Sequence, residues 1–316
     1  MSAIANLLHV TIQNKNSLLK TFTNYAGVGL LKLLASLPYP LLISIGYGLG
    51  FIAARIQSDR NRVVKTNLQM CFPNLDATQI DQLSKKHWRL LGRSLVEKSI
   101  IWLGTQQQLS NMIEVKSAVD LSSQKPRILV NMHFVGIEGS IILSALAKSM
   151  GWPRTSGFFQ RMKSPFYNKR IVEWRNQFGG NSIDRQGNVK AIIREIRNGD
   201  FIIIAPDIDL GLKDSEFVPF FGIETNTITT ISRLATITGA EVCMMTTTLK
   251  EDQSGYICEI SAPLENFPGI SPKSDTAWLN QYFENEIRLR PAEYYWVHKR
   301  FKNRPPHEAS PYNYSH

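Results

Sequence analysis

The chain has 316 residues, 43% of them hydrophobic, which excludes a disordered or fibrous protein and allows one large α/β domain or two small ones. Its three cysteines are widely spaced and show no paired-ligand pattern, which argues against both a disulfide scaffold and a zinc site. A formal net charge of +10 predicts an anionic partner, either a membrane surface or an acidic protein, and nucleic acid is disfavoured because no RNA-binding or helix-turn-helix signature accompanies the charge.

An apolar segment near the N-terminus predicts association with a membrane. Residues 36–54 are uncharged and reach about the minimum length for crossing a bilayer, but Pro38 and Pro40 interrupt their beginning. We therefore expect an interfacial or re-entrant helix, with the basic residues after it on the cytoplasmic side. A cleaved signal peptide is not indicated, because residues 1–24 are polar. A pair of buried core helices is the alternative.

Helical and strand patterns then alternate along the chain. A long helix is predicted from Asp76, a candidate N-cap, to Gly104, which can end it. The other predicted elements are strand 127–132, helix 139–148, helix 187–199, strand 201–205, helix 225–238, strand 241–249 with a hairpin partner at 255–260, and helix 278–289. This alternation indicates an α/β fold with a mostly parallel, twisted sheet flanked by helices on both faces.

The most informative motif lies where strand 127–132 ends. His133 is followed five residues later by Glu138, at the start of the next helix. A neutral imidazole can take a proton from a hydroxyl while a carboxylate fixes its tautomer, so the two residues are predicted to be a general base and its orienting group. No other histidine of the chain has an acidic residue at this spacing. A structural histidine near a turn is the alternative.

A second strand end carries two acidic residues, Asp207 and Asp209, directly after strand 201–205. Functional groups gather beyond the carboxyl ends of parallel strands, so we expect these residues in the same site as His133. Two alternatives remain for them: they cap the loop, or they hold a divalent cation. The chain has no glycine-rich phosphate loop that would support a nucleotide–metal site.

Basic residues gather between the two strand ends. As a group they suit the phosphates of an anionic lipid, because guanidinium binds phosphate in a bidentate manner. For any single one of them, a solvated helix face is the alternative. The arginines considered as substrate-binding residues are Arg161, Arg170, Arg175 and Arg185.

Several segments together resemble a known family, the bacterial lipid A late acyltransferases, within the wider lysophospholipid and glycerolipid acyltransferase group. They occur in family order and, with the apolar N-terminal segment, cover nearly the whole chain: 131–138, 173–179, 205–211, 217–222 and 293–306. The organisation expected from this resemblance is a membrane-associating segment, a single acyltransferase domain and a flexible tail, at residues 1–60, 61–304 and 305–316.

The resemblance implies that His133 is the base, that Glu138 supports it, and that Arg175 and Asp207 belong to the active site. Asp209 and the remaining arginines are further candidates for substrate binding. The implied reaction moves an acyl chain from an acyl thioester, on acyl carrier protein or coenzyme A, to a hydroxyl of a Kdo-lipid A precursor, with no other cofactor and no metal.

The partners implied are acyl carrier protein, an anionic glycolipid and a membrane surface, with the catalytic domain on the cytoplasmic face of the bacterial inner membrane. Two alternatives stay open. One is an acyltransferase that acts on another lysolipid or glycolipid, and the other is a non-catalytic lipid-binding protein in which His133 and Glu138 are structural.

Overall fold

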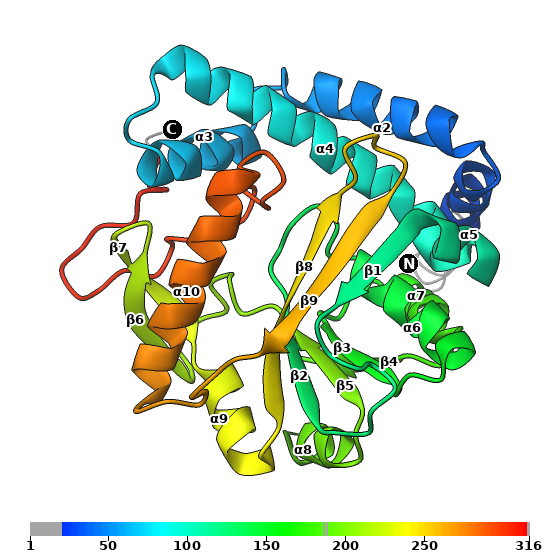
Figure 1. Ribbon diagram of the computed structural model, residues 1–316. Helices are drawn as coiled ribbons and strands as arrows, with labels where there is room; N and C mark the ends of the chain where they lie inside the picture. Colours follow the sequence, from blue (N-terminus) through cyan, green and yellow to red (C-terminus); the bar gives the residue numbers. More distant parts are fainter. Residues whose placement is uncertain (1–20, 186, 188, 315–316) are drawn as a thin grey trace, which may run out of the picture.

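The computed structural model describes residues 21–185, 187 and 189–314 (Figure 1). In this part of the chain the main sheet has seven strands, in the order β1-β9-β8-β2-β5-β3-β4. The strands are β1 (Ile113–Ser117), β2 (Arg127–Val130), β3 (Thr155–Phe159), β4 (Asn181–Asp184), β5 (Phe201–Ile204), β8 (Glu241–Leu249) and β9 (Tyr256–Pro263). Two further strands, β6 (Ser215–Phe220) and β7 (Ile223–Ile228), form a separate antiparallel pair.

Most neighbouring strands of the main sheet are parallel. β2 pairs in parallel with both β5 and β8, and β3 pairs in parallel with β5 and β4. The exception is the antiparallel hairpin of β8 and β9, to which β1 adds in parallel with β9. The predicted α/β fold with a mostly parallel sheet is confirmed, and so is the hairpin.

Helices cover both faces of the sheet (Figure 1). They are α2 (Tyr39–Ala53), α3 (Asp59–Cys71), α4 (Ala77–Leu103), α5 (Gln106–Met112), α6 (Gly139–Met150), α7 (Pro165–Asn176), α8 (Val189–Arg197), α9 (Thr230–Thr238) and α10 (Pro272–Leu289), with a further helical stretch at 21–35. The predicted long helix is α4, with the expected capping by Asp76 and its end at Gly104.

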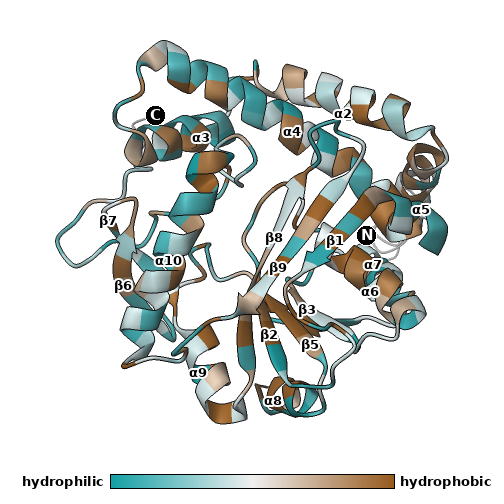
Figure 2. Cartoon of the chain, viewed as in Figure 1, coloured by the Kyte–Doolittle hydropathy of each residue, from teal (hydrophilic) through white to brown (hydrophobic). Residues whose placement is uncertain are grey.

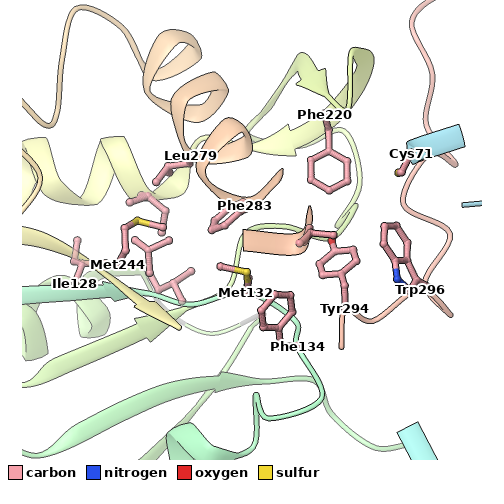
Figure 3. Packing of buried hydrophobic residues seen from close by; sticks show 14 of the residues in the cluster. Cys71, Ile128, Met132, Phe134, Phe220, Met244, Leu279, Phe283, Tyr294 and Trp296 are labelled. Carbon is pink, nitrogen blue, oxygen red and sulfur yellow. The ribbon is translucent and has the colours of Figure 1, made fainter. Parts of the chain in front are cut away.

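Successive residues of β2 point into two different cores, as side chains of a strand must. Ile128 and Val130 join the core formed with α3, α9 and α10, part of which Figure 3 shows. Leu129 joins the core on the opposite face, formed with α4, α5 and α6. Figure 2 shows the resulting hydrophobic strands in the middle of the molecule. Burial on both faces explains why β2 is a continuous apolar run in the sequence.

α2 lies against α4 and the helical stretch 21–35 lies against α7, but both leave apolar side chains in contact with solvent. α2 approaches α4 closely, because a Cβ atom on Gly50 would lie only 2.1 Å from the carbonyl oxygen of Trp88. Over the described residues, no helix is both long and apolar enough to cross a bilayer. Membrane association of residues 1–60 therefore stays a prediction, and residues 1–20 lie outside the described part. The exposed apolar side chains are Phe22, Tyr25, Leu30, Leu33, Leu41, Leu49, Phe51, Ile52 and Ile56.

Two predicted helices have the wrong boundaries. The helix expected at 225–238 begins only at Thr230, because residues 223–228 form β7, and β-branched residues such as Thr225 and Thr227 favour extended structure. The helix expected at 278–289 begins at Pro272, because Ser271 caps it with a capping box.

The C-terminal tail also needs correction. A flexible tail was expected at residues 305–316, but Tyr312 is buried in the core. Its hydroxyl donates to Asn67 and accepts from the backbone N–H of Phe301. Tyr312 and Tyr314 therefore pack back onto the molecule near α3, whereas residues 306–309 are exposed and residues 315–316 lie outside the described part.

Candidate active site

The register of two neighbouring strands brings His133 and Asp207 together. Val130 of β2 pairs with Ile204 of β5, and each strand ends at that residue. His133 and Asp207 both come three residues after their strand end, so the parallel pairing places them side by side. The structure therefore unites two of the predicted site residues.

The carboxylate of Asp207 holds His133 through two hydrogen bonds, one to the imidazole and one to the backbone. Nδ1 of His133 lies 2.7 Å from Oδ1 of Asp207, and the backbone N–H of His133 donates to Oδ2 at 2.9 Å. An ionised carboxylate can only accept, so Nδ1 carries the proton and Nε2 keeps its lone pair. Since the His133 side chain is 21% exposed, a substrate can reach it. This geometry suits a general base.

Asp207 is charged although it is fully buried. Burial by itself raises the pKa of this carboxyl, but the charge and hydrogen bonds of His133, followed by the charge of Arg300, outweigh burial and hold the pKa below its usual value. Arg300 is itself buried, and it donates to the backbone oxygen of Asn226 and the hydroxyl of Thr227. A charged Asp207 can stabilise the imidazolium that forms when His133 accepts a proton.

Glu138 does not occupy the position predicted for it. Its side chain lies at the start of α6, where Oε1 is 3.7 Å from Nη1 of Arg175 on α7. Its other oxygen, Oε2, is buried and forms no hydrogen bond of ordinary geometry with the described residues. The indole N–H of Trp102 is nevertheless close enough to interact with the carboxylate and lower the Glu138 pKa. The carboxylate that orients His133 is therefore Asp207, because the turn after His133 carries Glu138 towards α4 and α7.

The charge on Glu138 is nevertheless maintained. Burial raises the pKa of its carboxyl, but the positive charges of Arg175 and then Lys98 more than compensate, and the pKa lies below its usual value. Arg175 is the one predicted arginine that reaches this carboxylate within the described residues, and its side chain is only 15% exposed. The structure thus forms a partly buried Glu138–Arg175 pair beside the His133–Asp207 pair.

The other predicted arginines lie on the surface. Arg161 pairs with Asp184, and Arg170 pairs with Glu173 at 3.2 Å on the exposed side of α7. Arg185, after β4, is exposed as well. The solvated-face alternative accounts for these three positions, and any role of theirs in substrate binding stays a prediction.

Asp209 supports a loop instead of facing a substrate. It is 1% exposed, Oδ1 accepts from Gly211, Asn226 and the side chain of Asn303, and Oδ2 accepts from the backbone of Asn303. These contacts fit the loop-capping alternative and do not support the predicted contact with substrate. Within the described ranges, no group of three or more His, Cys, Asp or Glu side chains is placed to hold a metal ion.

The C-terminal segment 293–303 adds site residues that the pattern of strands and motifs did not single out. The ring of Tyr295 lies beside that of His133, with 6.2 Å between centroids and an angle of 32° between the ring planes. The hydroxyl of Tyr294 donates to the backbone oxygen of Asp207 at 3.0 Å, and Nε2 of His298 donates to that of Asp209 at 3.2 Å. The only signal for these residues in the sequence was the family resemblance of residues 293–306.

A histidine base oriented by a buried carboxylate, beyond the carboxyl ends of parallel strands and beside a buried arginine, defines a transferase or hydrolase that activates a hydroxyl. Comparison with known protein families identifies the family. The sequence model of the family described as bacterial lipid A biosynthesis acyltransferase matches residues 11–303. The chain belongs to this family. It is an O-acyltransferase of lipid A biosynthesis.

Individual relatives match along most of their length. The chain is 30% identical over 300 residues to the lipid A biosynthesis palmitoleoyltransferase of Escherichia coli strain K12, covering 90% of this chain and 93% of that protein. It is also 30% identical to the lipid A biosynthesis lauroyltransferase of the same strain, with 91% and 94% covered. A lipid A biosynthesis acyltransferase of Haemophilus influenzae is 28% identical, with 89% and 90% covered.

Proposed function

We propose that this enzyme transfers a fatty acyl chain from an acyl thioester to a free hydroxyl of a Kdo-lipid A precursor, with His133 as the general base. The observation that carries the proposal is the 2.7 Å contact between Nδ1 of His133 and Asp207, which leaves Nε2 of a partly exposed imidazole free to accept a proton. Family membership supports the lipid A pathway as the setting.

The proposed reaction needs only this pair of side chains and the thioester. Nε2 of His133 takes the proton of the acceptor hydroxyl. At the same time the hydroxyl oxygen attacks the thioester carbonyl and forms the new C–O bond. Asp207 stabilises the imidazolium. The tetrahedral intermediate then breaks its C–S bond, and the departing thiolate receives the proton from Nε2, which restores the neutral imidazole. No covalent acyl-enzyme is formed, and the thioester is the only co-substrate.

Arg175 is the residue that we assign to an anionic group of the substrates. Its guanidinium is mostly buried and lies next to Glu138, close to the base, so it can bind a phosphate or carboxylate of the lipid or the phosphate of a phosphopantetheine arm. We further propose that acyl carrier protein is the donor, because the net charge of +10 attracts an acidic protein.

The N-terminal helices are proposed to hold the enzyme on the cytoplasmic face of the inner membrane. Apolar side chains such as Phe22, Leu33 and Ile52 are more than half exposed, which in water alone is unfavourable. Basic residues close by, including Arg55 and Arg60, suit anionic headgroups. A helix that lies in the interface fits this pattern.

The test is an acylation assay with His133→Ala and purified wild-type enzyme. Each is incubated with a tetra-acylated Kdo-lipid A precursor and acyl donors on acyl carrier protein or coenzyme A, and the product mass is measured. The two Escherichia coli relatives named above differ in the chain that they transfer, so the donors include lauroyl and palmitoleoyl chains and the myristoyl chain of intermediate length. We expect His133→Ala to lose about 10²- to 10⁴-fold in rate.

The control is His307→Ala, which removes an exposed histidine and leaves the rate unchanged. Undiminished transfer by His133→Ala would disprove the role of the base. Transfer by the wild type to a lysophospholipid but not to the Kdo-lipid A precursor would keep the chemistry and replace the acceptor.

A further inference from the structure

The C-terminal segment pairs with the backbone that follows His133. The N–H of Tyr295 donates to the carbonyl of His133 at 2.8 Å, and the N–H of Val135 donates to the carbonyl of Glu293 at 2.8 Å. Between them, Phe134 and Tyr294 form an antiparallel bridge. The backbone around the base is therefore held by a segment that arrives from the other end of the chain.

The same segment also holds the loop that carries Asp207. This loop has no regular secondary structure, because β5 ends at Ile204. The hydroxyl of Tyr294 donates to the carbonyl of Asp207 itself, whereas His298 and Asn303 bind Asp209, two residues further on. Tyr294 thus binds Asp207 through its hydroxyl, and the next residue, Tyr295, binds the carbonyl of His133 through its backbone N–H.

The ring of Tyr294 is fixed by close packing. It is 2% exposed and makes edge contacts with Trp296 and Phe134, at centroid distances of 4.8 and 6.3 Å, and Figure 3 shows it between these residues and Phe220. Burial raises the pKa of the Tyr294 hydroxyl well above its usual value, so the hydroxyl stays protonated and remains a donor. A tightly packed ring with a constant donor can fix the backbone position of Asp207.

We propose that Tyr294 is a positioning residue of the acyl transfer reaction: its hydroxyl holds the Asp207 backbone so that the carboxylate stays on Nδ1 of His133. The proposal rests on the proposed role of the His133–Asp207 pair. It assigns Tyr294 no contact with substrate. The competing explanation is that the Tyr294 hydroxyl stabilises the core and has no separate influence on the reaction.

The decisive variant is Tyr294→Phe, which keeps the ring and removes one hydroxyl. The matched control is Tyr312→Phe, a second buried tyrosine of the C-terminal region, whose hydroxyl binds Asn67 and Phe301 and neither member of the pair. For both variants and the wild type, kcat, KM for each substrate, the melting temperature and the NMR signal of the His133 Nδ1 proton are measured. The His133→Ala variant identifies that signal.

We expect Tyr294→Phe to lower kcat about 10-fold or more, since a small misplacement of a catalytic group has a large effect on rate. Both KM values should change less than twofold, and the Nδ1 proton signal should broaden or shift. Tyr312→Phe should lower the melting temperature about as much as Tyr294→Phe does, but it should leave kcat and the proton signal as in the wild type.

Two results would overturn the proposal. One is an unchanged kcat for a fully folded Tyr294→Phe variant. The other is an equal fall of kcat in both tyrosine variants, which would indicate general loosening of the core. If either result is found while His133→Ala is inactive, the proposed role of the His133–Asp207 pair still holds and only the role of Tyr294 is rejected. An active His133→Ala variant would instead remove the function on which the proposal rests.

Discussion

Two carboxylates, the buried Asp207 and the partly buried Glu138, flank the turn that follows His133, and they are bonded very differently. Asp207 accepts from both the imidazole and the backbone N–H of His133. Glu138 has its nearest described cation, Arg175, at 3.7 Å and one oxygen without an ordinary hydrogen bond. Buried polar atoms are nearly always bonded. Asp207 is fully bonded within the protein, whereas Glu138 can still accept a hydrogen bond from a substrate. The comparison assigns Asp207 to the base and Glu138 to the substrate side.

The elements that support the two carboxylates differ as well. Asp207 lies on a loop held by the C-terminal segment, whereas Glu138 lies among helices α4, α6 and α7. Trp102 of α4 stacks on Trp174 of α7, with 6.1 Å between ring centroids, next to Arg175. Because α7 also carries exposed basic residues, the Glu138 side is where we expect the anionic parts of the substrates to enter.

Exchanging the carboxylate of Asp207 for an amide tests the first half of this comparison and should have the largest effect. Asp207→Asn keeps the shape but cannot stabilise an imidazolium, and it permits the wrong tautomer of His133, so kcat should fall about 10³- to 10⁴-fold. Single-turnover transfer from a labelled acyl donor measures it. Asp120→Asn, at an exposed loop position, is the control and should have no effect. A greater loss in Glu138→Gln than in Asp207→Asn would reverse the two assignments.

The Glu138–Arg175 pair should show an intermediate effect, because we assign it to substrate binding. Glu138→Gln and Arg175→Gln are each expected to lower kcat/KM about 10-fold. The double variant should lose less than the product of the two, since residues of one pair couple by about 0.5–3 kcal/mol. The four values of kcat/KM form the cycle that measures this coupling.

The exposed pair Arg233–Asp214, on α9 and the loop before β6, is the control for that cycle. Surface pairs contribute about 0–1 kcal/mol, so its variants should be nearly neutral and additive. Additive losses in the Glu138–Arg175 cycle would show that the two residues act separately, against the shared binding role.

The sequence predicts the part of the fold that hydrophobic periodicity and capping encode. β2, β5 and β8 are apolar runs because both faces of the central strands are buried, and α4 has recognisable residues at both ends. The edge strand β4 gave no such signal, because all four of its residues are only partly buried. Its sequence Asn-Ser-Ile-Asp therefore resembles a loop.

The site was predictable only to the level of its components. His133 and Asp207 follow two strands, and parallel pairing brings such ends to one edge of the sheet. Which carboxylate binds the imidazole depended on the register of β2 and β5, which spacing along the chain does not contain. Glu138, close to His133 in sequence, is turned away from Nδ1. The contacts of Tyr294 and His298 depend on how segment 293–303 folds back onto the strand ends, which no local pattern encodes.

The smallest expected effect concerns stability at acidic pH. It depends on His298, which contacts the Asp207 loop, and not on Glu138. Burial, the charge of His133 and nearby cations lower the pKa of His298 to about 4, so it is neutral in the folded state, whereas in the unfolded chain it titrates near its ordinary value of about 6.5. Between these values the unfolded state binds more protons. Stability is therefore lost as the pH falls from 6.5 towards 4, by about 2 kcal/mol at pH 5.

Urea unfolding at pH 7.5 and pH 5 measures this loss, and His298→Gln should reduce it, because an amide keeps a donor for the Asp209 carbonyl but does not titrate. His87, whose pKa burial also lowers to about 4, contributes equally to wild type and variant, so their difference isolates His298. Glu138→Gln should leave the pH 5 loss unchanged, because a carboxyl whose pKa lies below its usual value stays charged at that pH. An equal loss of stability in His298→Gln and the wild type would mean that the loop around Asp207 is more open to water than its contacts imply.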